Sequence, residues 1–446
     1  MMKRAMWCAA VLCWTTATSW AAAASVPTPV TLAEAVRLAL ASDETVQQAS
    51  QGVAAAEAQV AAARSGRMPT LDLGAEYTAN LKKPVMFLPA DMAVAFGGAT
   101  KLEMGGDFEL LGALTARINL WTAGRLSSSA GAARGWLDAS RFREQAVRDY
   151  VRYAATSAYY DVLLAEAELA NAELALAETG EAARLAQLGL AQGTISRFDS
   201  LRAEVELANH RPRLVQARNR RDLSRLALAR VCGAEVAPAD SLDAAAGPGD
   251  IESLVARMRE GSPELKALSA VVNAREQQVR LAGAARGPVV QLSANYALQG
   301  QWDDDLLPGT DETAASSQAA LAIQFPIFDG GRARADIGAA RAELQSARLE
   351  LARALRDQEL AVRQAALSLE NALAALDGAQ QNVRLAQETY RLAVVRLESG
   401  VGTPLERLDA ELALSTARAH LATALHASHL ARAALELAVG PGGSAS

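Results

Sequence analysis

The 446-residue sequence is poor in the residue types on which enzymes with bulky cores and disulfide-rich proteins depend. Aromatic side chains make up only 4% of it, and it has three cysteines and four histidines. Three cysteines exclude a disulfide framework, and four histidines leave little material for a zinc site. Alanine is visibly dominant, together with Leu, Glu, Arg and Gln, and this composition is typical of long helices.

An excess of positive charge is also missing. Lysine and arginine number 44 against 50 acidic residues, which gives a net charge of −6, and no basic block interrupts the chain. Nucleic-acid binding draws on clustered positive charge, so the sequence argues against a nucleic-acid partner. We therefore expect an interaction or transport protein and not an enzyme.

Sites for catalysis, cofactors or metals are not indicated either. The pair Gly330-Gly331 lacks the Lys and Ser that a phosphate-binding loop requires, so it is interpreted as a bend. His426 and His429 lie three residues apart on one helical stretch, near His420, but no acidic or cysteine partner has metal-site spacing. We expect these histidines on a helix surface, and we expect no catalytic residue, metal or cofactor.

The N-terminus has the organisation of a secretory signal peptide. Lys3 and Arg4 precede an apolar run, and Ala21 to Ala24 form a small-residue cleavage site, so residues 1–24 are predicted to be removed. An uncleaved membrane anchor is the alternative, although the run is short and contains Thr and Ser. No later stretch offers roughly 18 uninterrupted apolar residues, so we expect an exported chain without a helical anchor.

The cysteines fit this interpretation. Cys8 and Cys13 fall inside the predicted signal peptide, and neither follows the small residues that precede an acylated cysteine. We therefore expect no lipoprotein. Cys232 is alone in the mature chain, and we interpret it as a small core residue.

The two halves of the chain repeat each other. One constant offset aligns Val46 with Leu265, Glu57 with Glu276, Pro69 with Pro288 and Tyr77 with Tyr296. A second offset aligns Gly124, Gly193 and Gly233 with Gly331, Gly400 and Gly440. Such self-similarity predicts a first repeat over 25–233, a linker over 234–250, a second repeat over 251–440 and a short tail over 441–446.

Each repeat contains two stretches that alternate apolar and polar residues, as amphipathic strands do. The apolar sets are Leu71, Leu73, Ala75 and Tyr77; Phe108, Leu110, Leu114, Ile118 and Leu120; Val290, Leu292, Ala294 and Tyr296; and Leu321, Ile323, Phe325 and Ile327. Each run is about ten residues long, enough to cross a bilayer as a tilted strand. A half-buried soluble sheet would give the same alternation. The exported context favours a membrane barrel, which must be shared between chains because four strands cannot close one.

Two long helices follow the strand pairs, from about 124 to 188 and from 331 to 397. A seven-residue apolar repeat runs along the second, through Leu355, Val362, Leu369, Leu376, Val383, Tyr390 and Leu397. A row of alanines accompanies it, and a similar pair of rows marks the first helix. Heptads of this kind predict a supercoiled seam with closely approaching backbones. A plain coiled-coil rod would explain the heptads but not the four amphipathic strands.

Taken together, these segments resemble the TolC family of outer-membrane efflux channels. Thr31–Leu40 resembles the first short helix of that family, Ile327–Leu344 its strand-to-helix junction, and Glu398–Leu414 the tip of its helical hairpin. The resemblance covers nearly all of the mature chain. It implies a mainly α fold with a β-barrel section: a homotrimer whose twelve-stranded barrel lies in outer-membrane lipid and whose α-helical tunnel crosses the periplasm.

The resemblance also implies partners. Channels of this family dock onto a periplasmic adaptor protein and an inner-membrane pump, of the RND or ABC type. The function expected is then a passive exit duct of a tripartite efflux or type I secretion system. The alternative is a periplasmic structural or adaptor coiled coil whose strands form a small soluble domain.

Two equivalent turns are the candidate functional sites. Gly193 and Thr194 in the first repeat, and Gly400 and Gly402 in the second, fall where a long helix must reverse. The resemblance places these tips at the adaptor-docking end, although they are equally well explained as structural turns. Gly402 also stands where the family can carry a latch arginine.

Acidic residues follow each turn. By resemblance, Asp199 and Asp409 match entrance aspartates of the family, and Glu406 replaces a third. Threefold symmetry would make each a ring of carboxylates that favours cations. The alternative is that they are solvated acids stabilising helix N-termini. Arg202 of the first repeat occupies the position equivalent to Asp409 of the second, and we expect that the two side chains can form an ion pair.

Overall fold

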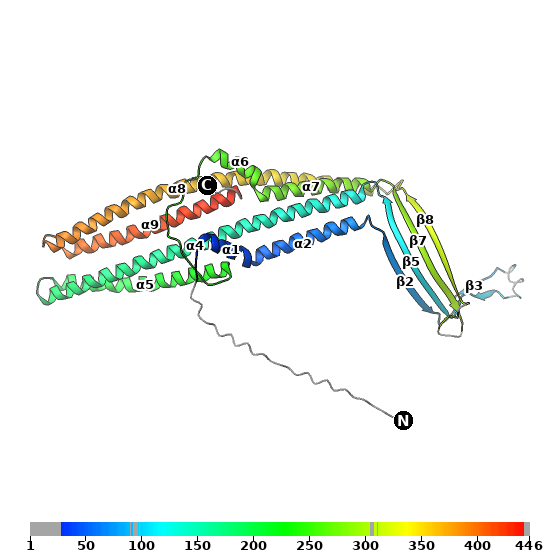
Figure 1. Cartoon of the computed structure of the whole chain (residues 1–446), viewed down its shortest axis with the longest axis horizontal. Helices are drawn as coiled ribbons and strands as arrows, with labels where there is room; N and C mark the ends of the chain where they lie inside the picture. The colour runs from blue at the N-terminus through cyan, green and yellow to red at the C-terminus, as the bar shows by residue number, and fades with distance from the viewer. Residues whose placement is uncertain are drawn as a thin grey trace, which may run out of the picture. The chain divides into compact units, whose positions relative to one another are not determined.

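Long helices carry most of the chain, as its alanine- and leucine-rich composition predicts. The computed structural model describes residues 28–89, 91, 97, 99–303, 307–309 and 311–440 (Figure 1). The predicted signal peptide over 1–24 and the predicted tail over 441–446 lie outside the described residues.

The elements of the first half of the chain are mostly long. They are β1 (Thr28–Val30), α1 (Leu32–Ser42), α2 (Glu44–Ser65), β2 (Thr70–Ala79), β3 (Val85–Phe87), β4 (Lys101–Glu103), β5 (Phe108–Trp121), α4 (Arg125–Ala191) and α5 (Arg197–Cys232). The second half contains β6 (Val236–Pro238), α6 (Ile251–Gly261), α7 (Pro263–Ala284), β7 (Val289–Trp302), β8 (Thr313–Gln324), α8 (Arg332–Glu398) and α9 (Pro404–Val439). The predicted long helices are thus confirmed as α4 and α8.

The chain divides into two compact units, and the long helices α4 and α8 contribute to both. The first unit comprises the described residues up to Ser42 together with Ala158–Leu242 and Ala386–Ala422. The second unit comprises Asp43–Ser157, Asp243–Leu385 and the described residues from Thr423 onward.

The second unit contains a four-stranded antiparallel sheet in the order β2-β5-β7-β8 (Figure 1). The register aligns side chains of one kind across it: Leu114 pairs with Tyr296, and Thr115 with Asn295. One face is therefore apolar and the other polar, as the alternation predicts. The apolar face is open in the single chain, where Leu73 is 81% exposed and Ile323 69% exposed.

The fourth strand is shorter than predicted. β8 ends at Gln324, so Phe325 and Ile327, which the alternation assigned to the strand, lie beyond it. Pro326 stands between them and has no N–H to donate to a neighbouring strand. The alternation of apolar residues continued past the point at which pairing stops.

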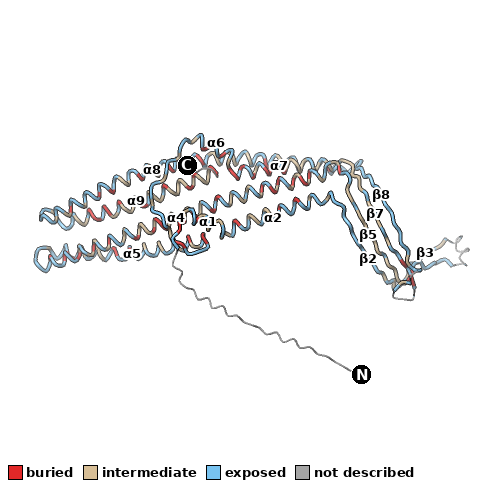
Figure 2. The backbone as a smooth tube through the Cα atoms, viewed as in Figure 1, coloured by how far each residue is buried: buried red, intermediate tan, exposed pale blue. Residues whose placement is uncertain are grey.

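Helices of the second unit pack through the predicted heptad positions. Val362 and Leu369 on α8 are fully buried and contact Met258 on α6 and Leu435 on α9 in one core cluster. Figure 2 shows buried residues recurring along the helices, whereas the strands of the sheet are mostly exposed or half-buried. The heptads therefore mark the seam, as predicted.

The first unit is organised around β1 and β6, which pair in parallel with Val30 opposite Pro238. The predicted linker over 234–250 thus contributes a strand, which its Pro/Gly/Ala-rich composition did not reveal. Tyr159 of α4 is fully buried beneath this pair, with its hydroxyl 3.0 Å from the carbonyl oxygen of Val30 and 2.7 Å from Asp240 Oδ2. Cys232 is buried in the same cluster, which confirms it as a core residue.

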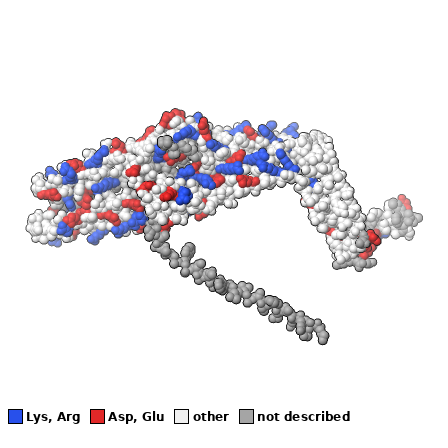
Figure 3. All heavy atoms as spheres, in the orientation of Figure 1, with Lys and Arg blue, Asp and Glu red and all other residues white. Residues whose placement is uncertain are grey.

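Two further features concern membranes. Among the helices that the structure describes, none combines the length and the apolar character of a membrane-spanning helix. Figure 3 shows a face of the sheet that is almost free of Lys, Arg, Asp and Glu along most of its length.

Candidate functional site

The candidate site consists of the two helix reversals of the first unit. α4 ends at Ala191 and α5 begins at Arg197, while α8 ends at Glu398 and α9 begins at Pro404. Gly193 and Gly400 have φ values of +75° and +73°, in the left-handed region that favours a residue without Cβ. The backbone N–H of each donates a 3.1 Å hydrogen bond back into the preceding helix. The reversals predicted at these two glycines are confirmed.

The other two predicted tip residues close the same turns. Thr194 donates hydrogen bonds from its N–H (2.9 Å) and its Oγ (3.0 Å) to the carbonyl oxygen of Gly189. Gly402 donates from its N–H to the carbonyl oxygen of Arg396 at 2.8 Å. A Cβ at Gly402 would stand 2.9 Å from the backbone carbon of Arg396, so this turn is too tight for any larger residue. All four residues therefore have a structural role in the turns.

Both following helices begin with a side-chain cap. Ser196 caps α5: its Oγ accepts from the N–H of Asp199 at 3.1 Å and donates to Asp199 Oδ2 at 2.6 Å. Thr403 caps α9, where its Oγ accepts from the N–H of Glu406 at 3.2 Å. Such caps satisfy backbone donors that a helix start leaves unpaired. The alternative prediction, that the candidate gate acids lie in the first helical turn, holds for Asp199 and Glu406 but not for Asp409, which lies farther along α9.

The three candidate gate acids are exposed, and two of them face arginines. Glu406 lies 3.4 Å from Arg396 across the second reversal. Asp409 on α9 lies 4.0 Å from Arg202 on α5, so the predicted pairing of these two residues forms at the outer limit of an ion pair. Exposed ion pairs of this length contribute little to the stability of the fold, so both carboxylates remain accessible to ions in solution.

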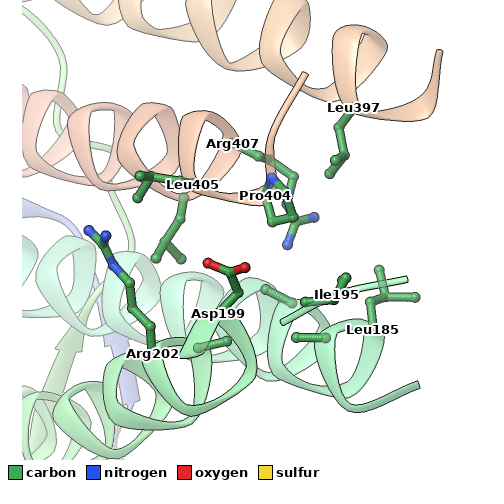
Figure 4. A pocket seen from close by; sticks show the side chains of 12 residues that line it. Leu185, Ile195, Asp199, Arg202, Leu397, Pro404, Leu405 and Arg407 are labelled. Atoms are coloured by element: carbon green, nitrogen blue, oxygen red, sulfur yellow. The ribbon is translucent and has the colours of Figure 1, made fainter. Parts of the chain in front are cut away.

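A mostly apolar cavity of about 260 Å³ lies between the two reversals (Figure 4). Leu185 and Ile195 line it from the first hairpin, and Leu397 and Leu405 from the second. Asp199 points toward this cavity in Figure 4, and Arg202 and Arg407 also lie at its edge. The reversals thus present apolar surface together with charges of both signs.

Several of these residues were not predicted as site residues. Arg396 and Arg407 carry the positive charge at the second reversal, and nothing in their spacing marks them among the many arginines of the chain. Leu397 was predicted only as a seam residue. The exposed apolar residues Phe198 and Leu405, directly after each turn, were the available signal.

The histidines near the C-terminus differ from the prediction in one respect. His429 is half-buried, and its Nε2 donates to the carbonyl oxygen of Asp243 at 2.5 Å, within the second unit. Burial is the main cause that lowers the pKa of His429. It therefore anchors part of the 234–250 segment and is not a plain surface residue. Within the described residues, no group of three or more His, Cys, Asp or Glu side chains could hold a metal ion.

Solved structures with the same fold include bacterial outer membrane channels. A membrane protein from Pseudomonas aeruginosa is 23% identical, with 92% of this chain and 93% of that chain covered and a TM-score of 0.75. The outer membrane protein VceC from Vibrio cholerae is 21% identical, with coverage of 93% and 97% and a TM-score of 0.74. The MtrE outer membrane channel of Neisseria gonorrhoeae is 20% identical, with coverage of 92% and 89% and a TM-score of 0.74. These likenesses confirm the predicted mainly helical, TolC-like fold.

A comparison with curated proteins found no match. The family model for outer membrane efflux proteins, in contrast, matches residues 35–234 and 254–441, which is most of the chain. The paired strand elements, the long helical hairpins and this match agree. The chain belongs to the outer membrane efflux protein family.

Proposed function

We propose that three copies of this chain form a passive exit duct, with the sheets in outer-membrane lipid and the helices as a tunnel in the periplasm. A periplasmic adaptor and an inner-membrane pump of the RND or ABC type would deliver the cargo. The sequence offers no nucleotide-binding loop, so the energy for transport would come from that pump. The chain belongs to a family of channel proteins, and this membership supports a conducting role and not a catalytic one.

The observation that carries the proposal is the sheet of the second unit. Within the described residues, β2 and β8 each pair with one neighbour only, which leaves two open edges. Open edges in hydrocarbon cost several kcal/mol for each unsatisfied backbone group. Joining β8 of one copy to β2 of the next removes every edge once the ring closes.

Side chains on the sheet agree with a lipid environment. The apolar face presents Leu71, Leu73, Leu321 and Ile323, each more than 60% exposed in the single chain. At the loop end, Phe108 stacks against Tyr77 at 5.9 Å and against Trp302 at 6.2 Å between ring centroids. Aromatic residues of this kind gather where a barrel meets the headgroup region.

Exposed leucines on α8 support the same assembly. Leu349, Leu360 and Leu367 are each more than half exposed in the single chain. Their spacing is close to whole numbers of helical turns, so they lie on one side of α8. Leucines on one stripe of a long helix are suited to packing against another helix. A neighbouring copy of the chain supplies such a helix.

The two reversals of the first unit are the proposed periplasmic entrance. Gly193, Thr194, Gly400 and Gly402 shape the tips that would meet the adaptor, and the apolar cavity between the tips supports this role. Asp199, Glu406 and Asp409 would form carboxylate rings around the entrance. A negative ring in a narrow mouth favours cations.

Membrane fractionation tests the proposal. On a sucrose gradient, the mature chain should sediment with the outer membrane and require detergent for extraction. In planar bilayers, the extracted protein should form channels that conduct ions without an added energy source. Release into the soluble periplasmic fraction, as expected for a structural or adaptor coiled coil, would contradict the proposal.

A further inference from the structure

Glu411 is a buried carboxylate in the first unit that has no hydrogen-bond partner among the described residues. The residue, on α9, is 3% exposed. Neither of its side-chain oxygens has a hydrogen-bond partner among the described residues. Buried carboxylates are normally paired or hydrogen-bonded, because an isolated buried charge is strongly unfavourable. This position therefore favours a neutral, protonated Glu411.

A nearby contact joins α9 to α4. Asn171 on α4 donates from Nδ2 to the carbonyl oxygen (2.9 Å) and to Oγ (3.2 Å) of Ser415 on α9. Ser415 follows Glu411 by about one helical turn, so Glu411 lies in the same α4–α9 packing. The other amide atom, Asn171 Oδ1, is a buried acceptor without a partner among the described residues. A protonated carboxyl supplies a donor, and an ionised one does not.

The charged and titratable groups around Glu411 come from three helices. Glu178 on α4 and Arg407 on α9 act on Glu411 directly, and Tyr390 on α8 interacts with Glu411 and also with Arg418 on α9. Burial, followed by the negative charge of Glu178, raises the pKa of Glu411 to about 7, against the opposing effect of Arg407. Burial and Glu178 also raise the pKa of Tyr390. The phenol therefore stays neutral near pH 7 and adds no charge that would compensate Glu411.

We propose that Glu411 is a proton-operated latch between the two helical hairpins of the first unit, α4–α5 and α8–α9. When Glu411 is neutral, α9 packs against α4. When Glu411 loses its proton to solvent, its charge and that of Glu178 repel, and the packing just beyond the α8–α9 tip loosens. The latch itself is a property of one chain, and it rests on the proposed duct only for its consequence, a pH-dependent entrance.

The direction of the pH effect follows from the two protonation equilibria. Below the ordinary value of 4.5, Glu411 is protonated whether the hairpins are packed or loosened. Between 4.5 and about 7 the loosened form loses the proton that the packed form retains, so packing weakens as pH rises. Above about 7 both forms are ionised and the weakening is complete. From about pH 6 to about pH 8, which spans the pKa of Glu411 in the packed form, the packing equilibrium should change about tenfold and then level off.

The sequence repeat supplies a matched control. Glu204 on α5 occupies the position in the first repeat that corresponds to Glu411 in the second. It is exposed and accepts a hydrogen bond from Gln187 at 2.8 Å. A Glu204→Gln variant therefore removes an equivalent carboxylate that is solvated and partnered.

Hydrogen exchange of the full-length protein in detergent, read by mass spectrometry on peptides from 404–420, tests the latch. After correction for intrinsic exchange, wild-type and Glu204→Gln proteins should lose protection about tenfold from about pH 6 to about pH 8. Glu411→Gln, which cannot ionise, should show the same protection at both pH values. A tenfold loss that persists in Glu411→Gln would overturn the proposal.

Two further measurements keep the test decisive. If Glu411→Gln does not fold, infrared spectroscopy of the wild-type protein should show a protonated carboxyl band that disappears as the pH passes through neutrality. The absence of such a band would overturn the latch. If the exchange results agree with the latch but planar bilayers show no channels at any pH, the latch stands and the proposed duct fails.

Discussion

Ser196 and Asp199 hydrogen-bond each other in both directions at the start of α5. The Ser196 hydroxyl donates to the Asp199 carboxylate at 2.6 Å, and the Asp199 N–H donates to Ser196 Oγ at 3.1 Å. The acid proposed for the entrance is therefore also part of a helix cap. Its carboxylate remains exposed, so the capping role and a role in an entrance ring are compatible.

This capping pair can be tested by truncation. Ser196→Ala removes the acceptor for the Asp199 N–H and should destabilise the hairpin by about 1 kcal/mol. The loss should appear as faster hydrogen exchange in the first turns of α5. Thr403→Ala, which removes the equivalent cap of α9, should have a similar effect confined to α9. Unchanged exchange in both variants would show that the caps do not hold the tips.

Gly402 should tolerate no side chain. The Cβ of alanine would stand 2.9 Å from the backbone carbon of Arg396, so Gly402→Ala must push the second reversal open. We expect the free energy of unfolding to fall by about 1–3 kcal/mol and efflux of the cargo to be impaired, while cross-linking still detects the proposed trimers. Gly378→Ala is the control, because its Cβ meets no atom within 4 Å and alanine favours a helix interior.

The positive φ of Gly400 and Gly193 allows a second test of the tips. Proline cannot adopt the φ of +73° found at Gly400, so Gly400→Pro should distort that reversal. Gly193→Asp should add a charge to the first reversal and strain its backbone, because φ at this position is +75°. Both variants should impair efflux while trimers still form. Normal efflux with either would argue against adaptor docking at the tips.

Cation selectivity should depend on the acids of the second tip. If Glu406 and Asp409 line the entrance, the double change Glu406→Ala with Asp409→Ala should weaken the cation selectivity of single channels in planar bilayers. Glu388→Ala is the control, since Glu388 is paired with Arg391 at 2.6 Å farther back on α8. Selectivity that stays at the wild-type value in the double variant would place both acids outside the gate.

Tyr159 should contribute to stability in a pH-dependent way. Tyr159→Phe removes the hydroxyl that joins Asp240 and Val30, and it should cost about 1–2 kcal/mol in thermal or denaturant unfolding. Burial, followed by the hydrogen bond to Asp240, raises the pKa of Tyr159 from 10.0 to about 12.

The folded protein therefore keeps a proton that the unfolded chain loses above the ordinary value of 10.0. The stability of the folded protein should fall as the pH rises from about 10 to about 12. In the Tyr159→Phe protein, the part of this fall that Tyr159 causes should be missing. Tyr150→Phe is the control, because Tyr150 is 62% exposed. An identical alkaline profile in the Tyr159→Phe protein would contradict this assignment.

Periodicity predicted the large elements because they are long. The heptad positions Val362 and Leu369 are buried as expected, and the strand alternation gave the correct faces for Leu114 and Thr115. The pairs β1–β6 and β3–β4 were missed, because a three-residue strand is too short to show a period. The residues after Gln324 were misassigned because alternation continues through Pro326, where backbone pairing cannot.

At the candidate site, the turn glycines were predictable because helix reversal demands a particular backbone, and one side-chain pair was predictable from the repeat. Arg202 was expected to pair with Asp409 on the strength of the repeat, and it does. Glu411 and Glu204 occupy equivalent positions, yet one is buried and the other exposed. Tertiary packing causes this difference in burial, and the sequence repeat carries no information about it.

The central claim is that the sheet of one chain is part of a barrel completed by two further copies. Native mass spectrometry of the detergent-purified protein tests this claim most directly, because it counts chains in the intact assembly. We predict a trimer that persists after the detergent micelle has been stripped away. A stable, folded monomer would contradict it, since β2 and β8 would then keep open edges in the membrane.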